Sequence, residues 1–108
     1  MPVKSNRQAF SFNRVERRIP MEIPVVLDGH RQMPGVESTF TENVSARGAR
    51  VVSTRRWEHG ERLTFASRTG EFRSSARVAY CQPLQGDGFA IGVEFLDAKG
   101  RWIVQNAR

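Results

Sequence analysis

Alternation of apolar and polar residues with a period of two dominates this chain and limits it to β-sheet structures. The longest alternating segment covers residues 72–80, and a second covers residues 89–95. Residues 85–88 between them, Gln-Gly-Asp-Gly, are typical of a tight turn. Because successive side chains of a strand point to opposite faces, each segment has one apolar face to bury. The two segments are therefore predicted to pair as an antiparallel hairpin.

Shorter alternating segments bring the expected number of strands to about six. They cover residues 23–27, 36–42, 49–53 and 63–65. Helical periodicity is almost missing from the chain. A closed or nearly closed antiparallel barrel removes the exposed edges of so small a sheet. We therefore expect an all-β fold that forms a six-stranded antiparallel β-barrel.

The two ends of the chain differ from this pattern. Residues 1–13 are polar apart from two isolated phenylalanines, and we expect a flexible N-terminal arm there. The barrel domain is expected to span residues 14–108. Its tail from Asp97 to Arg108 is expected to form a short C-terminal helix that Asp97 caps and that packs Trp102, Ile103 or Val104 on the barrel. Gly100 disfavours a helix at that point.

Composition and charge narrow the class of protein and of partner. The 108 residues are enough for one domain with a modest core. Cys81 is the one cysteine, so no intrachain disulfide forms, and a reducing cytoplasm is expected. No apolar run approaches the roughly 20 residues needed to span a bilayer. The formal charge of +6 and the pI near 11.0 favour an anionic partner.

Three arginines are close together in residues 14–18, Arg-Val-Glu-Arg-Arg. Arg14 and Arg18 are four residues apart, which places them on one side of an extended segment with Arg17 opposite, or beside each other in a helical turn. Their planar guanidinium groups suit bidentate bonds with phosphate oxygens and with the acceptor edge of guanine. Taken alone, the segment is more simply a solvated basic stretch.

A second motif, Asn43-x-Ser45-x-x-Gly48, lies where one strand-like segment ends and the next begins. Asn and Ser side chains at such corners commonly bond nearby backbone. Gly48 allows unusual dihedral angles and a close approach of backbone or ligand. Taken alone, the motif is more simply a well-formed turn with no ligand.

The two motifs together resemble the bipartite signature of PilZ domains, Arg-x-x-x-Arg followed by Asp or Asn-x-Ser-x-x-Gly. Many members have a similar Ile-Pro pair after the arginines, here Ile19-Pro20. Residues 49–51 after Gly48, Ala-Arg-Val, also resemble the family. Residues 89–96 resemble the final strand of the family. The resemblance covers residues 14–96. It implies a split β-barrel that binds the bacterial second messenger cyclic di-GMP.

The resemblance also implies roles for individual residues. Arg14 and Arg18 would grip phosphate and the Hoogsteen edge of a guanine, with help from Arg17. The second motif would line the opposite side of the ligand with Asn43, Ser45 and Gly48. Asn43 replaces the commoner Asp, and a neutral amide does not form the charge-assisted bonds of a carboxylate. Weaker candidates near the two motifs are Asn13, Arg47, Arg50 and Gly92.

We therefore expect a module that binds cyclic di-GMP and passes its level to an unidentified partner protein through ordering of the N-terminal arm. The alternatives are a small barrel that binds single-stranded nucleic acid, motivated by the pI, and a PilZ-like interaction module without a nucleotide. Nucleic acid is the less favoured partner because most aromatics fall in the predicted core register. No catalytic motif is present, and His30 and His59 lack partners at metal-ligand spacing. Neither an enzyme, a metal site nor a cofactor besides the ligand is expected.

Overall fold

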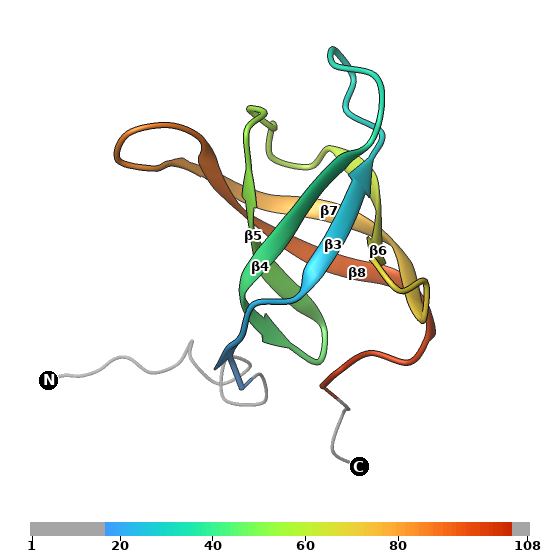
Figure 1. Cartoon of the computed structure of the whole chain (residues 1–108). Helices are drawn as coiled ribbons and strands as arrows, with labels where there is room; N and C mark the ends of the chain where they lie inside the picture. The colour runs from blue at the N-terminus through green and yellow to red at the C-terminus, as the bar shows by residue number, and fades with distance from the viewer. Residues whose placement is uncertain (1–16, 105–108) are drawn as a thin grey trace, which may run out of the picture.

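Six antiparallel strands close into a barrel in the computed structural model, which describes residues 17–104 (Figure 1). The strands of the barrel are β3 (Pro24–Asp28), β4 (Glu37–Ser45), β5 (Gly48–Ser53), β6 (Arg62–Ser67), β7 (Phe72–Pro83) and β8 (Phe89–Gly100). Neighbours around the barrel follow the order β3-β6-β7-β8-β5-β4, and β4 pairs back with β3. A further strand, β2 (Ile19–Pro20), also pairs with β4. The predicted six-stranded antiparallel barrel is confirmed, with one short strand added.

The longest hairpin joins β7 and β8, which pair from Phe72↔Gly100 to Pro83↔Phe89. The turn between them is closed by a hydrogen bond of 3.0 Å, in which the Leu84 N–H donates to the Gly88 carbonyl. In Figure 1 this turn extends to one side of the barrel. The hairpin that the alternation on either side of residues 85–88 predicts is thus confirmed.

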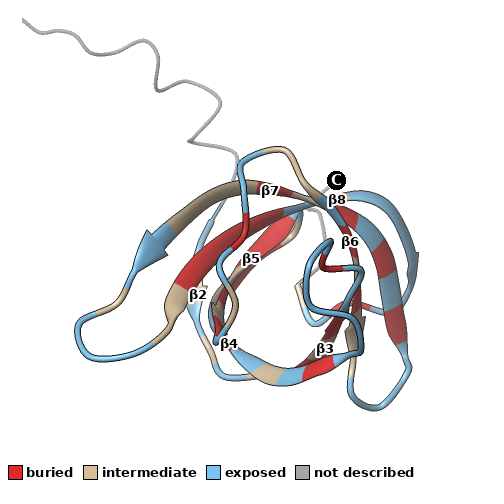
Figure 2. Cartoon of the chain, turned by 90° about the horizontal axis from the view of Figure 1, so that it is seen from above, coloured by how far each residue is buried: buried red, intermediate tan, exposed pale blue. Residues whose placement is uncertain are grey.

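Alternation of buried and exposed positions along the strands builds the core (Figure 2). An aromatic cluster fills one part of it, with ring centroids 4.7–6.2 Å apart, and consists of Phe65, Phe72, Phe95 and Trp102. Aromatic pairs at this spacing stabilise a core beyond the burial of their area. Of the three residues of the tail that the sequence offers for packing on the barrel, Trp102 is buried in the core, Val104 packs against it and Ile103 is exposed.

The C-terminal helix predicted from Asp97 is wrong for the part of it that the structure describes. From Asp97 to Gly100 the chain continues β8 and stays paired with β7, and residues 101–104 are not helical. Pairing with β7 satisfies backbone groups that a helix would have satisfied internally. Residues 105–108 lie outside the described part, as do residues 1–13, the predicted arm.

A buried polar cluster lies where β4 begins and β5 ends. The Glu37 side chain is almost fully buried and accepts three bonds, from the Ser53 hydroxyl at 2.8 Å and from the Thr54 N–H and hydroxyl at 2.6 and 3.0 Å. The Trp57 indole N–H donates to the Ser53 hydroxyl oxygen at 3.1 Å. Trp57 is itself buried against the barrel.

Candidate functional site

The second sequence motif forms the tight hairpin between β4 and β5. Ser45 pairs with Gly48 across a turn of two residues, and Asn43 pairs with Arg50. The Ser45 side chain is fully buried, and its hydroxyl oxygen accepts from the Arg47 N–H at 3.3 Å. The Ser45 carbonyl accepts from the Trp102 indole N–H at 2.8 Å. Ser45 therefore supports the hairpin from inside.

Gly48 is required by a close approach of two strands. It pairs with Glu94 of β8, and a Cβ atom there would overlap the carbonyl oxygen of Val93. Its φ lies outside the left-handed region, so the unusual dihedral angles expected from the sequence are wrong. The close approach that the sequence also predicted is confirmed for the backbone.

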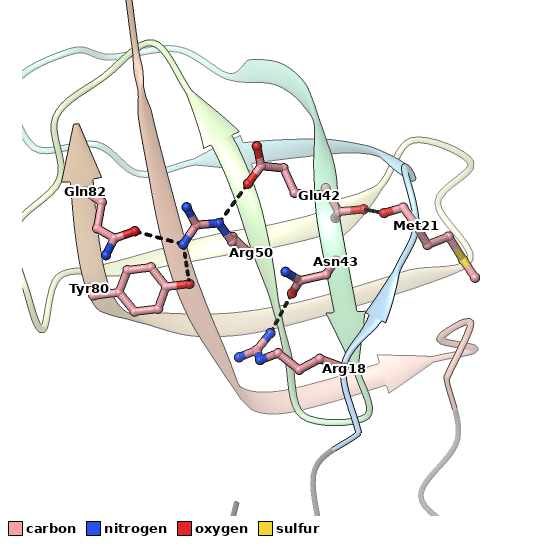
Figure 3. A network of polar contacts seen from close by, with 8 residues as sticks. Arg18, Met21, Glu42, Asn43, Arg50, Tyr80 and Gln82 are labelled. Atoms are coloured by element: carbon pink, nitrogen blue, oxygen red, sulfur yellow. Dashed lines mark hydrogen bonds and ion pairs between the residues drawn. The ribbon is translucent and has the colours of Figure 1, made fainter. Parts of the chain in front are cut away.

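Arg18 connects the first motif to the second. It directly precedes β2, which pairs with β4 through Ile19↔Val44 and Pro20↔Asn43. In this register the Arg18 guanidinium donates to the Asn43 side-chain oxygen at 2.8 Å, on the exposed surface (Figure 3). Arg17 is exposed just before it, whereas Arg14 and Asn13 lie outside the described residues. The two motifs, 25 residues apart at this pair, thus meet on β4.

A hollow of about 250 Å³ opens beside this hairpin. Its lining comes from the first motif, the hairpin, β7 and β8, and consists of Arg18, Arg47, Gly48, Arg77, Ala79, Tyr80, Gly92, Val93 and Glu94. The Glu94 carboxylate is paired with Arg77 at 2.7 Å, which offsets its charge. Arg18 and Arg47 therefore leave the hollow with a positive potential, which favours an anionic ligand.

Arg50 of β5 is held by three side chains at once (Figure 3). Its Nε donates to Glu42 at 2.8 Å, and its Nη1 donates to the Tyr80 hydroxyl at 3.1 Å and to Gln82 at 2.9 Å. The bond to Glu42 first, and then the bond to Tyr80, raise the pKa of the Arg50 guanidinium above its usual value. Arg50 is therefore engaged with protein groups, and Glu42 offsets its positive charge.

Tyr80 reaches this surface because of a β-bulge that the sequence did not reveal. Val78 pairs with Val93 and Tyr80 pairs with Gly92, which leaves Ala79 as an extra residue in β7. The alternation of residues 72–80 places Tyr80 in the core, but the bulge reverses the register after Val78. The half-buried ring instead contacts Gly92, where a Cβ atom would overlap it.

Comparison with known families agrees with this geometry. The family model described as "PilZ domain" matches residues 12–102. The chain belongs to the PilZ domain family. The resemblance found in the two motifs is therefore confirmed. PilZ domains are binding and regulatory modules.

Comparison with single proteins shows the PilZ fold again. A search of curated proteins finds no match. Among solved structures, the chain is similar to the Bacillus subtilis inhibitor of motility MotI/DgrA, with a TM-score of 0.63 and 18% identity over 78% of this chain. The chain spans 42% of the length of that protein, and at this identity the likeness shows the fold alone.

Other polar side chains of this PilZ domain have structural partners. His30 is buried against Trp57 and its Nδ1 accepts from the N–H groups of Gln32 and Met33, both at 3.1 Å. Its Nε2 lies 2.8 Å from the Arg56 carbonyl. Within residues 17–104, no group of three or more His, Cys, Asp or Glu side chains could hold a metal ion. The same residues contain no helix long and apolar enough to cross a membrane.

Proposed function

We propose that this PilZ domain binds cyclic di-GMP at the corner where Arg18 meets the β4–β5 hairpin. The observation that carries the proposal is the 2.8 Å bond between Arg18 and Asn43, which brings the two halves of the signature together. Cyclic di-GMP offers two phosphate charges and two planar purines with acceptor edges. A guanidinium fork bonds both kinds of group well, and it can also stack on a purine face.

The positive charge of this corner suits an anionic nucleotide, and the free energy of its hydrogen bonds is sufficient for binding. Each charge-assisted hydrogen bond contributes about 1.5–3 kcal/mol, and a micromolar affinity needs about 8 kcal/mol in total. Arg18 is exposed, so its fork can exchange the Asn43 oxygen for a phosphate at small cost. Arg17, and Arg14 from the sequence, add further donors along the same segment. A few such bonds therefore account for binding in a signalling range.

We further propose that the ligand level is passed to an unidentified partner protein through ordering of the N-terminal arm. The sequence supports this because the arm leads directly into the arginines. Ordering several residues opposes binding by roughly 1–2 kcal/mol per residue, so ligand binding and arm ordering are coupled. Hydrogen exchange of residues 1–13 measured with and without cyclic di-GMP tests this step. Unchanged exchange in the saturated protein contradicts it.

Single-stranded nucleic acid fits the described surface less well. Such a partner requires several exposed aromatic side chains on one face of the sheet, where bases stack. The exposed large apolar side chains within residues 17–104 are Met33, Val36, Phe40, Leu96 and Ile103, of which Phe40 is the one aromatic. A stacking platform of that kind is therefore not formed by this part of the chain.

Calorimetry with cyclic di-GMP, GTP, cyclic GMP and a short oligonucleotide tests the proposed ligand. We expect micromolar binding of cyclic di-GMP and weaker binding of the other three. Arg18→Ala removes at least one charge-assisted bond and should weaken binding about 10- to 150-fold. Arg73→Ala is the matched control, because Arg73 is an exposed arginine of β7 that does not line the hollow. No heat with the dinucleotide, or equal loss in both variants, contradicts the proposal.

A further inference from the structure

The outer surface of β5, β8 and β7 carries a cross-strand row of Arg50, Gly92 and Tyr80 beside the hollow. Arg50 pairs with Gly92 on one side, and Tyr80 pairs with Gly92 on the other. The Tyr80 ring lies so close to Gly92 that a Cβ atom there would overlap it. Because the middle residue has no side chain, the tyrosine can lie across β8 and reach the arginine.

Arg50 keeps the ring in this position. Its Nη1 donates to the Tyr80 hydroxyl at 3.1 Å, and its Cζ lies 5.7 Å from the ring centroid. The guanidinium is in turn held by Glu42 at 2.8 Å and Gln82 at 2.9 Å, one on each neighbouring side (Figure 3). We call this group of four residues the Arg50 clamp; it consists of Arg50, Glu42, Tyr80 and Gln82. The clamp fixes an aromatic ring at the tip and at one side.

Tyr80 is also part of the hollow next to the signature motifs. Tyr80 and Gly92 line the same hollow as Arg18, Arg47 and Gly48, and Tyr80 is half-buried. A ring that is fixed in place beside a positively charged hollow suits a planar base attached to a phosphate. Base–aromatic stacking is strong and does not depend on the identity of the base.

We infer that Tyr80 is the surface on which one purine of the ligand stacks, and that Arg50 is a positioning residue that holds this ring instead of contacting the ligand. This inference rests on the proposed function. It gives the site two distinct contributions, with Arg18 and its neighbours for the phosphates and the Tyr80 ring for a base. It also gives Gly92 a function, because any side chain there displaces the ring.

Calorimetry with cyclic di-GMP on four proteins tests the inference: the wild type, Tyr80→Leu, Arg50→Gln and the double variant. Loss of the ring in Tyr80→Leu should weaken binding about 5- to 150-fold. Arg50→Gln should weaken binding about 2- to 10-fold, because it removes the bond to the Tyr80 hydroxyl. In the double variant the Arg50 substitution should add nothing, since the residue that it positions is already lost.

The dependence on salt separates a positioning role from direct contact. A residue that neutralises a phosphate changes the slope of log affinity against log salt, whereas a residue that orients a ring does not. Arg50→Gln should therefore keep the slope of the wild type, while Arg18→Ala should lower it. Arg73→Gln, on the same strand as Tyr80 but outside the hollow, is the control for loss of one surface charge.

A measurement without ligand tests the clamp by itself. Tyr80 is the one tyrosine of the chain, so ring-¹³C labelling of tyrosine gives a single set of ring signals. In the free protein, Arg50→Gln and Gly92→Ala should both move these signals toward the values of an exposed tyrosine. Thermal unfolding of the same variants checks that the barrel is intact.

The outcomes separate this inference from the proposed function. No heat with the wild type overturns both of them. If the wild type binds cyclic di-GMP and Tyr80→Leu binds it with the same affinity, the stacking role alone is overturned. If Arg50→Gln weakens binding by the same factor with Tyr80 present and with Tyr80 replaced by Leu, the positioning role is overturned. A salt slope of Arg50→Gln that differs from that of the wild type also overturns it. Ring signals that do not move in Arg50→Gln overturn the clamp.

Discussion

Two polar clusters on the same pair of strands, β4 and β5, differ mainly in burial. In one, Glu37 of β4 accepts bonds from Ser53 of β5 and from Thr54 just after it, at 2.6–3.0 Å, and the residue is 8% exposed. In the other, Glu42 of β4 accepts from Arg50 of β5 at 2.8 Å, and the two side chains are 38% and 26% exposed. The bonds are equally short.

The difference in burial separates a contribution to folding from a contribution to binding. A buried acceptor that loses its donors costs the full desolvation of the groups left behind, whereas an exposed group exchanges its partner for water. The buried cluster therefore stabilises the barrel. The exposed cluster, together with Arg18 and Asn43, can therefore contribute to binding without being required for the fold.

The strongest challenge to this comparison is Glu37→Ala. It removes the acceptor of both Thr54 donors in a partly buried place and leaves the buried Ser53 hydroxyl with the Arg55 carbonyl as its acceptor, so we expect a loss of about 3 kcal/mol in the free energy of unfolding. Urea denaturation measures it. A loss as small as that of an exposed substitution would show that burial does not separate the clusters.

Gly48→Ala should give the next largest effect. The new Cβ atom would overlap the Val93 carbonyl oxygen, which belongs to the backbone of β8 and cannot swing away as a side chain can. Overpacking of this kind costs about 1–3 kcal/mol, again measured by urea denaturation. Gly92→Ala is the matched control, because the atoms nearest to its new Cβ belong to the side chain of Tyr80 and not to the backbone. Equal losses in both would contradict the distinction between the two glycines.

Asn43→Ala should affect binding and leave stability nearly unchanged. It removes the acceptor that holds Arg18 at the hairpin, and because this bond is exposed and water can replace it, its loss should cost about 0.5–1.5 kcal/mol. We expect cyclic di-GMP to bind about 2- to 10-fold more weakly in calorimetry, with an unfolding free energy within about 0.5 kcal/mol of the wild type. Asn43→Asp, which keeps an acceptor at the same place, should retain binding.

Glu42→Gln should have the smallest effect on stability. Exposed ion pairs contribute about 0–1 kcal/mol, and the amide still offers an oxygen to Arg50. The change in unfolding free energy should stay below about 0.5 kcal/mol and shrink further at high salt. A loss comparable to that of Glu37→Ala would remove the contrast between the two clusters.

Alternation in the sequence is sufficient to predict the barrel, because each strand buries one face. It fails at Tyr80, where one extra residue in β7 moves the side chain from the predicted core to the outer surface. It also fails from Asp97 onward, because pairing with β7 overrides the local signals for a helix. Both failures arise from the pairing of β7 with β8, and the local pattern of one segment does not contain that pairing.

The candidate site was predictable where a motif names the residues and less so where packing decides their orientation. Arg18 and Asn43 meet as the two motifs imply. Ser45 was expected to face the ligand, but the hairpin turns its side chain inward, and its role at the site stays a prediction. Tyr80 and Gln82 belong to no motif, and only the register of β7 against β8 brings them to Arg50.

The bond from the Trp102 indole to the Ser45 carbonyl supplies this domain with an intrinsic optical probe. Trp102 touches the backbone of the hairpin that carries the second motif, whereas Trp57 is bonded to Ser53 at the far end of β5. The two are the only tryptophans of the chain. Emission from Trp57→Phe protein would therefore follow the hairpin alone, and a titration could be monitored without an attached dye.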